Sequence, residues 1–288
     1  MQICDILIKK RNSANFAERV ERYFMKKYFK ALLTAGLIVL IAACSPQPKE
    51  YALPEKATYT VTNRTYSEDY HKDDVKIASY SFTVPEIASS SSEDDNMCAE
   101  FNMFFKEYAE KLVEGFKSDV YSLALDDYSA DAEKWGDKFY SDNVSYSYVK
   151  TENYLGIMFD SYTSVGGDAP VSGTAFYMYD LENGRFFTYK DLSDDIEGFK
   201  EAISQDILTQ LMEQGGENLS ADYENKVKNL ENIQMCFCEE GVMVIIPRVA
   251  VNPKNTGAQQ LLLDYSVVEP YLNDYALEMF FEYTGVVG

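Results

Sequence analysis

The 288-residue sequence has little histidine and few basic residues, and each shortage argues against a class of function. Its one histidine, His71, argues against most catalytic and metal sites, which need a second imidazole or a partner close by. Only 26 Lys and Arg residues stand against 47 Asp and Glu, for a net charge of −21. Because clustered basic side chains drive nucleic-acid binding, we expect no nucleic-acid partner. The sequence shows no repeat of fixed period, which argues against solenoids and propellers.

One long apolar run is present, Ala31–Ala43, and it is shorter than the roughly 20 residues needed to span a bilayer. The basic segment Met25–Lys30 precedes it, and small residues followed by Cys44 end it. A basic head, an apolar core and small residues at the cleavage point describe a secretory signal. The ending Ile41-Ala42-Ala43-Cys44 resembles the lipobox of bacterial lipoproteins. The alternative is a buried core helix that ends in Ala-Ala-Cys.

The lipobox resemblance implies a division of the N-terminal part. Residues 25–43 form the signal peptide, and residues 1–24 are a mis-assigned upstream extension. Cys44 becomes the lipidated N-terminus, which would hold the protein on a membrane because its acyl chains are buried there. Residues 44–56, with two prolines directly after the cysteine, form a tether. We expect a lipid-anchored protein of a Gram-negative cell envelope, on the outer membrane and facing the periplasm.

Cleavage makes the protein more acidic. Residues 1–43 hold eight of the 26 basic and three of the 47 acidic residues, so the mature chain carries a net charge of −26. Such a surface repels anionic lipid and attracts cationic partners. The alternative is a solvated acidic surface without a dedicated partner.

The mature chain predicts an α+β fold over residues 57–288, with an N-terminal part at 57–160 and a C-terminal part at 161–288. Strands are expected where polar residues alternate with β-branched or aromatic ones, and tight turns make neighbouring strands antiparallel. Two long amphipathic helices are expected to pack on one face of this mostly antiparallel sheet. Their apolar stripes are Met97, Phe101, Phe104, Phe105, Tyr108, Leu112 and Phe116, and then Ile196, Phe199, Ile203, Ile207 and Leu211.

Local signals set the expected boundaries. Pro85 is expected to end the strand that begins at Val75, because proline lacks an N–H group. Asn183-Gly184 is typical of a type I′ hairpin turn, in which both central residues have positive φ. Asp69–Asp74, around His71, reads as a polar loop.

From about Ile77 to Leu272 the chain resembles the domain of unknown function 3298, with a 4163-type segment before it. The resemblance is carried by four segments: Tyr162–Gly167, Tyr177–Gly184, Lys190–Leu192 and Ile245–Gly257. This family occurs in the extracytoplasmic part of the anti-sigma factor RsiV and beside PdaC-type deacetylase domains. It implies a binding or sensing domain, which in RsiV is a receptor for lysozyme. We take Gly166, Gly167 and Asp168 as the candidate binding loop.

No set of residues in the sequence predicts a metal, a cofactor or a catalytic centre. Cys98, Cys236 and Cys238 are either free thiols or include one disulfide, of Cys98 with Cys236 or Cys238. The chain lacks a Gly-rich phosphate loop and a GxSxG motif.

Three functions are consistent with these observations. The first is a binding or sensing module whose ligand is a cationic, lysozyme-like protein or a cell-wall glycan such as peptidoglycan. The second is a carboxylate-based cell-wall hydrolase, which would need two carboxyl groups about 5–10 Å apart. The third is a structural envelope lipoprotein without a small ligand.

Overall fold

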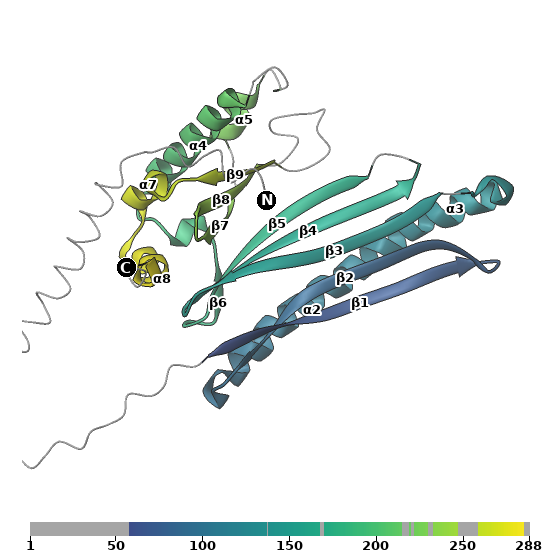
Figure 1. Ribbon diagram of the computed structural model, residues 1–288, viewed down its shortest axis with the longest axis horizontal. Coiled ribbons are helices and arrows are strands. Elements are labelled where there is room, and N and C mark those ends of the chain that lie inside the picture. Colours follow the sequence, from purple (N-terminus) through teal and green to yellow (C-terminus); the bar gives the residue numbers. More distant parts are fainter. Residues whose placement is uncertain are drawn as a thin grey trace, which may run out of the picture. The chain divides into compact units, whose positions relative to one another are not determined.

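The structure is a computed structural model that describes residues 58–136, 138–167, 170–214, 219, 222–229, 233–246 and 259–284. These residues all belong to the compact unit Ala57–Gly288 (Figure 1). The predicted extension, signal peptide, lipidation site Cys44 and tether therefore lie outside the described residues, as does Asp168 of the candidate loop. No helix among the described residues is both long and apolar enough to cross a membrane.

Six strands form the larger sheet, and they follow one another in space in chain order. They are β1 (Tyr59–Lys72), β2 (Val75–Ser89), β3 (Phe139–Lys150), β4 (Tyr154–Gly166), β5 (Val171–Asp180) and β6 (Arg185–Phe187). Every neighbouring pair is antiparallel except β2 and β3, which run parallel over Ser79–Phe82 and Ser141–Val144. A parallel pair needs a long crossover, and here the chain makes it with its longest helix.

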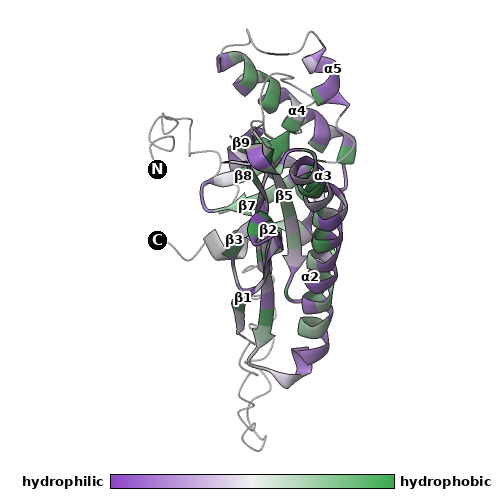
Figure 2. Cartoon of the chain, turned by 90° about the vertical axis from the view of Figure 1, so that its right-hand side faces the viewer, coloured by the Kyte–Doolittle hydropathy of each residue, from purple (hydrophilic) through white to green (hydrophobic). Residues whose placement is uncertain are grey.

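That helix begins with a short 3₁₀ turn, Ser92–Asp94, and has three further parts. These are α2 (Asp95–Phe116), a π-helical segment (Lys117–Tyr121) and α3 (Ser122–Ala130), followed by a 3₁₀ turn at Ala132–Lys134. The sequence placed the start near Asp95. Of the predicted apolar stripe α2 buries Phe101, Phe105 and Phe116, whereas Phe104 is exposed. Figure 2 shows the helix running along one side of the sheet.

The main core lies between this helix and the sheet. On β2, Tyr80, Phe82 and Val84 alternate with polar residues and face the helix. Phe101 and Phe105 on α2 are fully buried against them, with ring centroids 4.8 Å apart. Burying apolar area stabilises the fold by about 25 cal/mol per Å². The strands, with a period of two residues, and the helix, with a period of 3.6, each present one apolar face. Packing the helix on the sheet therefore buries both apolar faces.

A smaller sheet follows in the C-terminal part. It contains β7 (Gln234–Cys238), β8 (Gly241–Ile246) and β9 (Gln259–Leu263), all antiparallel. Its neighbours are α4 (Ile196–Glu213), α5 (Tyr223–Lys228), α7 (Tyr265–Val268), α8 (Asp274–Thr284) and 3₁₀ turns at Tyr189–Asp191 and Glu269–Tyr271. Helix α4 contacts β9, α5 and α7.

The predicted α+β class and the mostly antiparallel sheet are confirmed. The placement of the second helix differs from the prediction: α2 packs on the large sheet, whereas α4 packs on the small one. Both helices bury an apolar stripe as their periodicity predicts. The stripe does not specify which sheet will cover it, because any apolar surface of matching shape serves.

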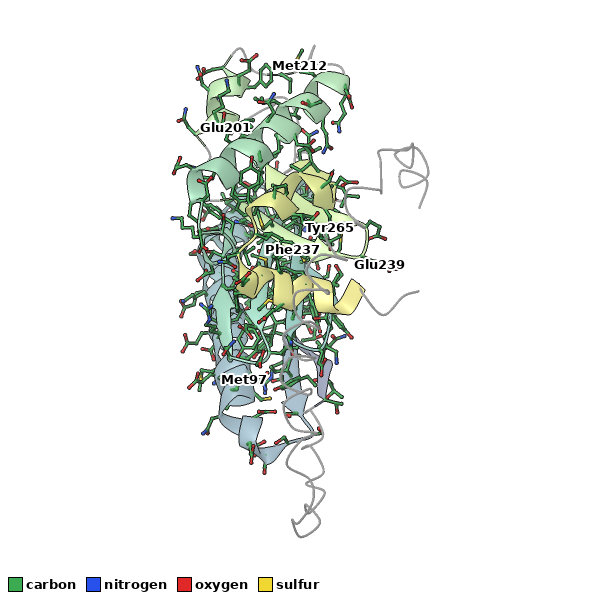
Figure 3. The ribbon with its side chains drawn as sticks, turned by 90° about the vertical axis from the view of Figure 1, so that its left-hand side faces the viewer. Met97, Glu201, Met212, Phe237, Glu239 and Tyr265 are labelled. Atoms are coloured by element: carbon green, nitrogen blue, oxygen red, sulfur yellow. The ribbon has the colours of Figure 1, made fainter. Side chains whose placement is uncertain are left out.

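Strand β7 packs against the face of the large sheet that α2 does not cover. Tyr154 on β4 is fully buried there, and its hydroxyl accepts the N–H of Phe237 at 3.1 Å. Phe237 in turn stacks on Phe280 of α8, with ring centroids 3.6 Å apart. Figure 3 shows Phe237 and Tyr265 together in this region, while Met97 lies near the start of α2. The small sheet therefore covers one end of that face.

The expectation that Pro85 ends β2 is wrong, because the strand continues to Ser89. Pro85 opposes Asn63 of β1, and pairing with β3 has already stopped at Phe82. The missing N–H therefore does not interrupt a ladder on the β3 side. Further along this edge, the side chain of Asn102 on α2 accepts the N–H of Ile87 at 2.8 Å and donates to its carbonyl at 3.0 Å.

The type I′ turn lies at a different place from the one predicted. At Asn183-Gly184 only the glycine has positive φ, whereas Asp73 and Asp74, between β1 and β2, have φ of 49° and 63°. Aspartate tolerates this conformation better than most residues because its short side chain bonds locally. The turn extends β1 to Lys72, so His71 lies on a strand and not in a loop.

Candidate functional site

The predicted binding loop begins at the end of β4. Gly166 has φ of +72°, and a Cβ there would lie 2.6 Å from the Tyr140 hydroxyl. Gly167 has no neighbour within 4 Å of a Cβ position. Position 166 therefore requires glycine, both because its φ is positive and because the Tyr140 hydroxyl is close. Neither requirement applies to Gly167.

This difference predicts that substitutions at the two adjacent glycines will affect stability unequally. Gly166→Ala is expected to lower the free energy of unfolding by about 1–3 kcal/mol, because it adds both strain and a clash. Gly167→Ala is expected to change it by less than about 0.5 kcal/mol. Urea denaturation followed by circular dichroism measures both, and equal losses in the two variants would contradict the assignment.

An aromatic cluster stands beside Gly166. The rings of Trp135 and Tyr140 stack at 5.5 Å, and both are buried. The Tyr140 hydroxyl donates to Asp127 of α3 at 2.5 Å, and Lys138 pairs with the same carboxylate at 3.2 Å. These two hydrogen bonds lower the pKa of Asp127. The cluster holds the C-terminal end of the long helix to β3, which is a structural task.

The hairpin segment that carries the family resemblance also has a structural explanation. Asp180 is 0% exposed, and its carboxylate accepts the N–H groups of Glu182 and Asn183, both at 2.9 Å. It also accepts the Asn183 side chain at 2.8 Å and the Tyr275 hydroxyl of α8 at 2.6 Å. Burial and the bond to Asp180 raise the pKa of Tyr275. One aspartate thus shapes the turn and fixes the C-terminal helix.

Cys98, Cys236 and Cys238 are free thiols. Cys98 is a residue of α2 and lies in the core between this helix and the sheet. Cys236 contacts the Tyr154 hydroxyl at 3.3 Å on the opposite face of the large sheet. The body of the sheet therefore separates Cys98 from β7. Burial raises the pKa of Cys236 to about 11 and also raises that of Cys98 and Cys238. Because the thiolate is the reactive form, these thiols are poor nucleophiles.

Asp142 on β3 is a described carboxyl group whose pKa is raised, whereas those of Asp127 and Asp191 are lowered. Burial raises its pKa, while hydrogen bonds from the Thr163 hydroxyl, at 2.9 Å, and from the Asn143 backbone oppose the shift. No second carboxyl group is among the causes of that shift. Within the described residues, no group of three His, Cys, Asp or Glu side chains could hold a metal ion.

The remaining feature is the part of the large sheet that neither α2 nor the small sheet covers. Here most of the side chains opposite the core are short, uncharged and polar, and we name this surface the hydroxyl face. Its members are Thr65, Ser67 and Asp69 (β1), Ser79, Ser81 and Thr83 (β2), Phe139, Ser141, Asn143, Ser145 and Ser147 (β3), Asp160, Tyr162 and Ser164 (β4), and Ser172 and Thr174 (β5). Ser141 is only 2% exposed and Thr174 accepts the Gln260 side chain of β9 at 3.2 Å, while the other members are exposed or partly exposed.

The register aligns these residues in rows that cross the strands. One row runs through the pairs Ser67–Ser81, Ser81–Asn143, Asn143–Tyr162 and Tyr162–Ser172. Strand spacing is about 4.8 Å, so a row of five residues spans about 19 Å. Neighbouring hydroxyls bond each other, as Thr65 does with Thr83 at 3.0 Å.

The hydroxyl face carries little charge on a strongly acidic protein. Its two carboxylates both have partners: Asp69 pairs with Lys76 at 2.8 Å, and Asp160 accepts the Thr174 hydroxyl at 3.0 Å. Two aromatic rings stand exposed on it, Phe139 at 52% and Tyr162 at 48%. The surface combines dense neutral donors and acceptors with flat rings, which suits a neutral polar ligand.

The sequence reasoning did not identify this face. The signal was present in β2 and β3, where Ser79, Ser81 and Thr83 and then Ser141 to Ser147 place small polar residues at every second position. Polar residues at every second position indicate that one face of a strand is solvated. Only the pairing of β2 with β3 shows that the polar residues of the two strands lie side by side. The predicted loop glycine Gly166 lies at the edge of the face, since it pairs with Phe139.

The chain is thus an α+β protein in which one long helix covers a mostly antiparallel six-stranded sheet. No family model and no curated protein matches it. A member of the DUF3298 family from Bacteroides fragilis is similar in structure, with a TM-score of 0.54 and 18% identity over 76% of this chain and 95% of that one. A DUF3298 protein from Pseudomonas aeruginosa PAO1 has a TM-score of 0.53 and 12% identity over 76% and 96%.

These similarities show that the chain shares the fold of DUF3298 proteins, a family of unknown function. The resemblance noted from the sequence is therefore supported at the level of fold.

Proposed function

We propose that this chain is a lipid-anchored extracytoplasmic binding module of a Gram-negative envelope, held on the outer membrane by Cys44 and facing the periplasm. Its ligand is a cell-wall glycan or a protein. The observation that carries the binding role is the hydroxyl face, an uncovered, hydrogen-bonding surface that crosses five strands. The lipobox-like segment before Cys44 supports the location.

Binding is favoured over hydrolysis by the chemistry of the carboxyl groups. A glycosidase needs two carboxyl groups that act on one bond, one of them with a raised pKa. Asp142 has a raised pKa, but its described partners are a hydroxyl and a backbone group. The neutral rings and hydroxyls of the hydroxyl face lie on the opposite side of the sheet from Asp142 and suit recognition.

The anchor predicts the behaviour of one variant. Cys44→Ser is expected to abolish incorporation of radiolabelled palmitate and to move the protein from the membrane fraction to the soluble fraction, because no acyl chain is attached. Cys238→Ser is the matched control and should keep both the label and the membrane location. Sucrose-gradient separation of the two membranes tests the outer-membrane assignment. Palmitate that persists on Cys44→Ser would exclude this anchor.

A further inference from the structure

We infer that the hydroxyl face binds an uncharged glycan chain, which lies flat across the strands with a sugar ring against Tyr162. This inference rests on the proposed binding function and specifies its ligand. The row Ser67, Ser81, Asn143, Tyr162 and Ser172 supplies the contacts. It offers hydroxyl and amide groups, which both donate and accept hydrogen bonds, at intervals of about 4.8 Å.

The hydroxyl face matches the chemistry of a sugar. A pyranose ring has polar hydroxyls around its edge and apolar C–H groups on its faces. Tyr162 is about half exposed, so a flat ring can rest on it, whereas Phe139, also about half exposed, lies four residues along β3 from Asn143 and about 13 Å from the row. Asn143 is opposite Tyr162 in the register, so an amide stands beside the ring. An aromatic platform next to amide and hydroxyl groups matches both parts of a sugar.

The charge of the hydroxyl face favours an uncharged ligand. The chain carries −21 overall, yet this face has only Asp69 and Asp160, and both are already bonded. An anionic ligand would be repelled by the protein as a whole. A cationic protein would find its complement on the acidic remainder of the surface and not on this neutral face. An uncharged ligand is not repelled by the acidic protein and does not depend on acidic side chains for binding. It also binds without the free-energy cost of desolvating a charged group.

A second copy of the chain fits the hydroxyl face less well than a glycan does. Stable homodimer interfaces are rich in apolar area at their centre. The hydroxyl face has two exposed rings among small polar side chains, and an identical face would bring hydroxyls against hydroxyls without new apolar burial. A flexible, hydroxylated chain adapts its hydrogen bonds to this surface more readily than a rigid copy does.

The test uses the full-length lipidated protein in detergent and isothermal titration calorimetry. The probes are chitohexaose and cellohexaose, both neutral, and hexagalacturonate, which is anionic. We expect at least one neutral probe to bind and hexagalacturonate not to bind. Tyr162→Ala should weaken binding at least about tenfold. Tyr148→Ala is the matched control, since Tyr148 is also 48% exposed but lies on the other side of the sheet, and should change affinity less than about twofold.

Each result supports or overturns the inference. Unchanged melting temperatures of Tyr162→Ala and Tyr148→Ala would show that both variants are folded. Asn143→Leu, which removes the amide, should also weaken binding of the neutral probe. Equal affinity of Tyr162→Ala and wild type, or equal binding of hexagalacturonate, would overturn it. Self-association that Tyr162→Ala abolishes would assign the face to a second copy. No binding of any neutral probe would overturn the ligand class while leaving the palmitate test of the anchor unaffected.

Discussion

Replacement of Asp180 with alanine is expected to lower the free energy of unfolding by about 3–5 kcal/mol, which is a large part of the stability of an ordinary domain. The carboxylate is 0% exposed and accepts four hydrogen bonds, from Glu182, from the backbone and side chain of Asn183, and from Tyr275. Its removal leaves four part-buried donors without this acceptor, and a buried donor left unpaired costs about 1–3 kcal/mol.

Tyr275→Phe separates the two tasks of this aspartate. It removes one hydrogen bond to a charged group, for an expected loss of about 1.5–3 kcal/mol, and leaves the turn intact. A double-mutant cycle of Asp180→Ala and Tyr275→Phe should show a coupling energy, because the two groups share one bond. Chemical denaturation measures all three variants. Asp194→Ala is the control, since Asp194 is exposed, and a comparable loss there would contradict the assignment.

A side chain at Gly156 is expected to cause the second large loss, of about 3 kcal/mol for Gly156→Val. Gly156 lies on β4 between the large sheet and β7, and a Cβ there would lie 2.3 Å from the Tyr154 hydroxyl and 2.5 Å from the Cys236 sulfur. Both neighbours are buried, so neither can move away without disturbing the junction. Amides of β7 should exchange faster with solvent in this variant, as hydrogen exchange would show.

A second cycle tests this mechanism. Tyr154→Phe removes the atom closest to the new Cβ, at the cost of the bond from the Phe237 N–H. Gly156→Ala combined with Tyr154→Phe should therefore lose less stability than the sum of the two single variants. Strict additivity of the two losses would show that the clash at Gly156 has another origin.

The functional proposals depend on a different surface from these stability sites. Asp180 and Gly156 lie at junctions between elements, whereas the hydroxyl face is open to solvent. Variants at Asp180 are therefore expected to test folding, and variants at Tyr162 to test binding. The segment Tyr177–Gly184 belongs to the first group, because its Asp180 accepts the Tyr275 hydroxyl and so holds α8 in place.

Local structure could be predicted from the sequence to a large extent. The apolar stripe from Met97 to Phe116 predicted a helix, and the alternation in Tyr59–Thr65 and Val75–Val84 predicted the strands β1 and β2, because each depends on the spacing of neighbouring side chains. Helix α8 was missed, although Asn273 caps it by accepting the N–H of Ala276. Its eleven residues offer few turns over which a periodicity can be recognised.

The sequence by itself determined most of the elements, the acidic charge and the lipobox-like segment, because these depend on composition or on residues close together in the chain. Only the tertiary structure decided that β2 lies parallel to β3, that α4 covers a second sheet, and that Tyr275 reaches Asp180 across 95 positions. The physical reason is that hydrophobic burial is non-directional, so a pattern specifies that a face will be covered but not by what. The same pairing of distant strands assembles the hydroxyl face from segments that separately read as ordinary solvent-facing residues.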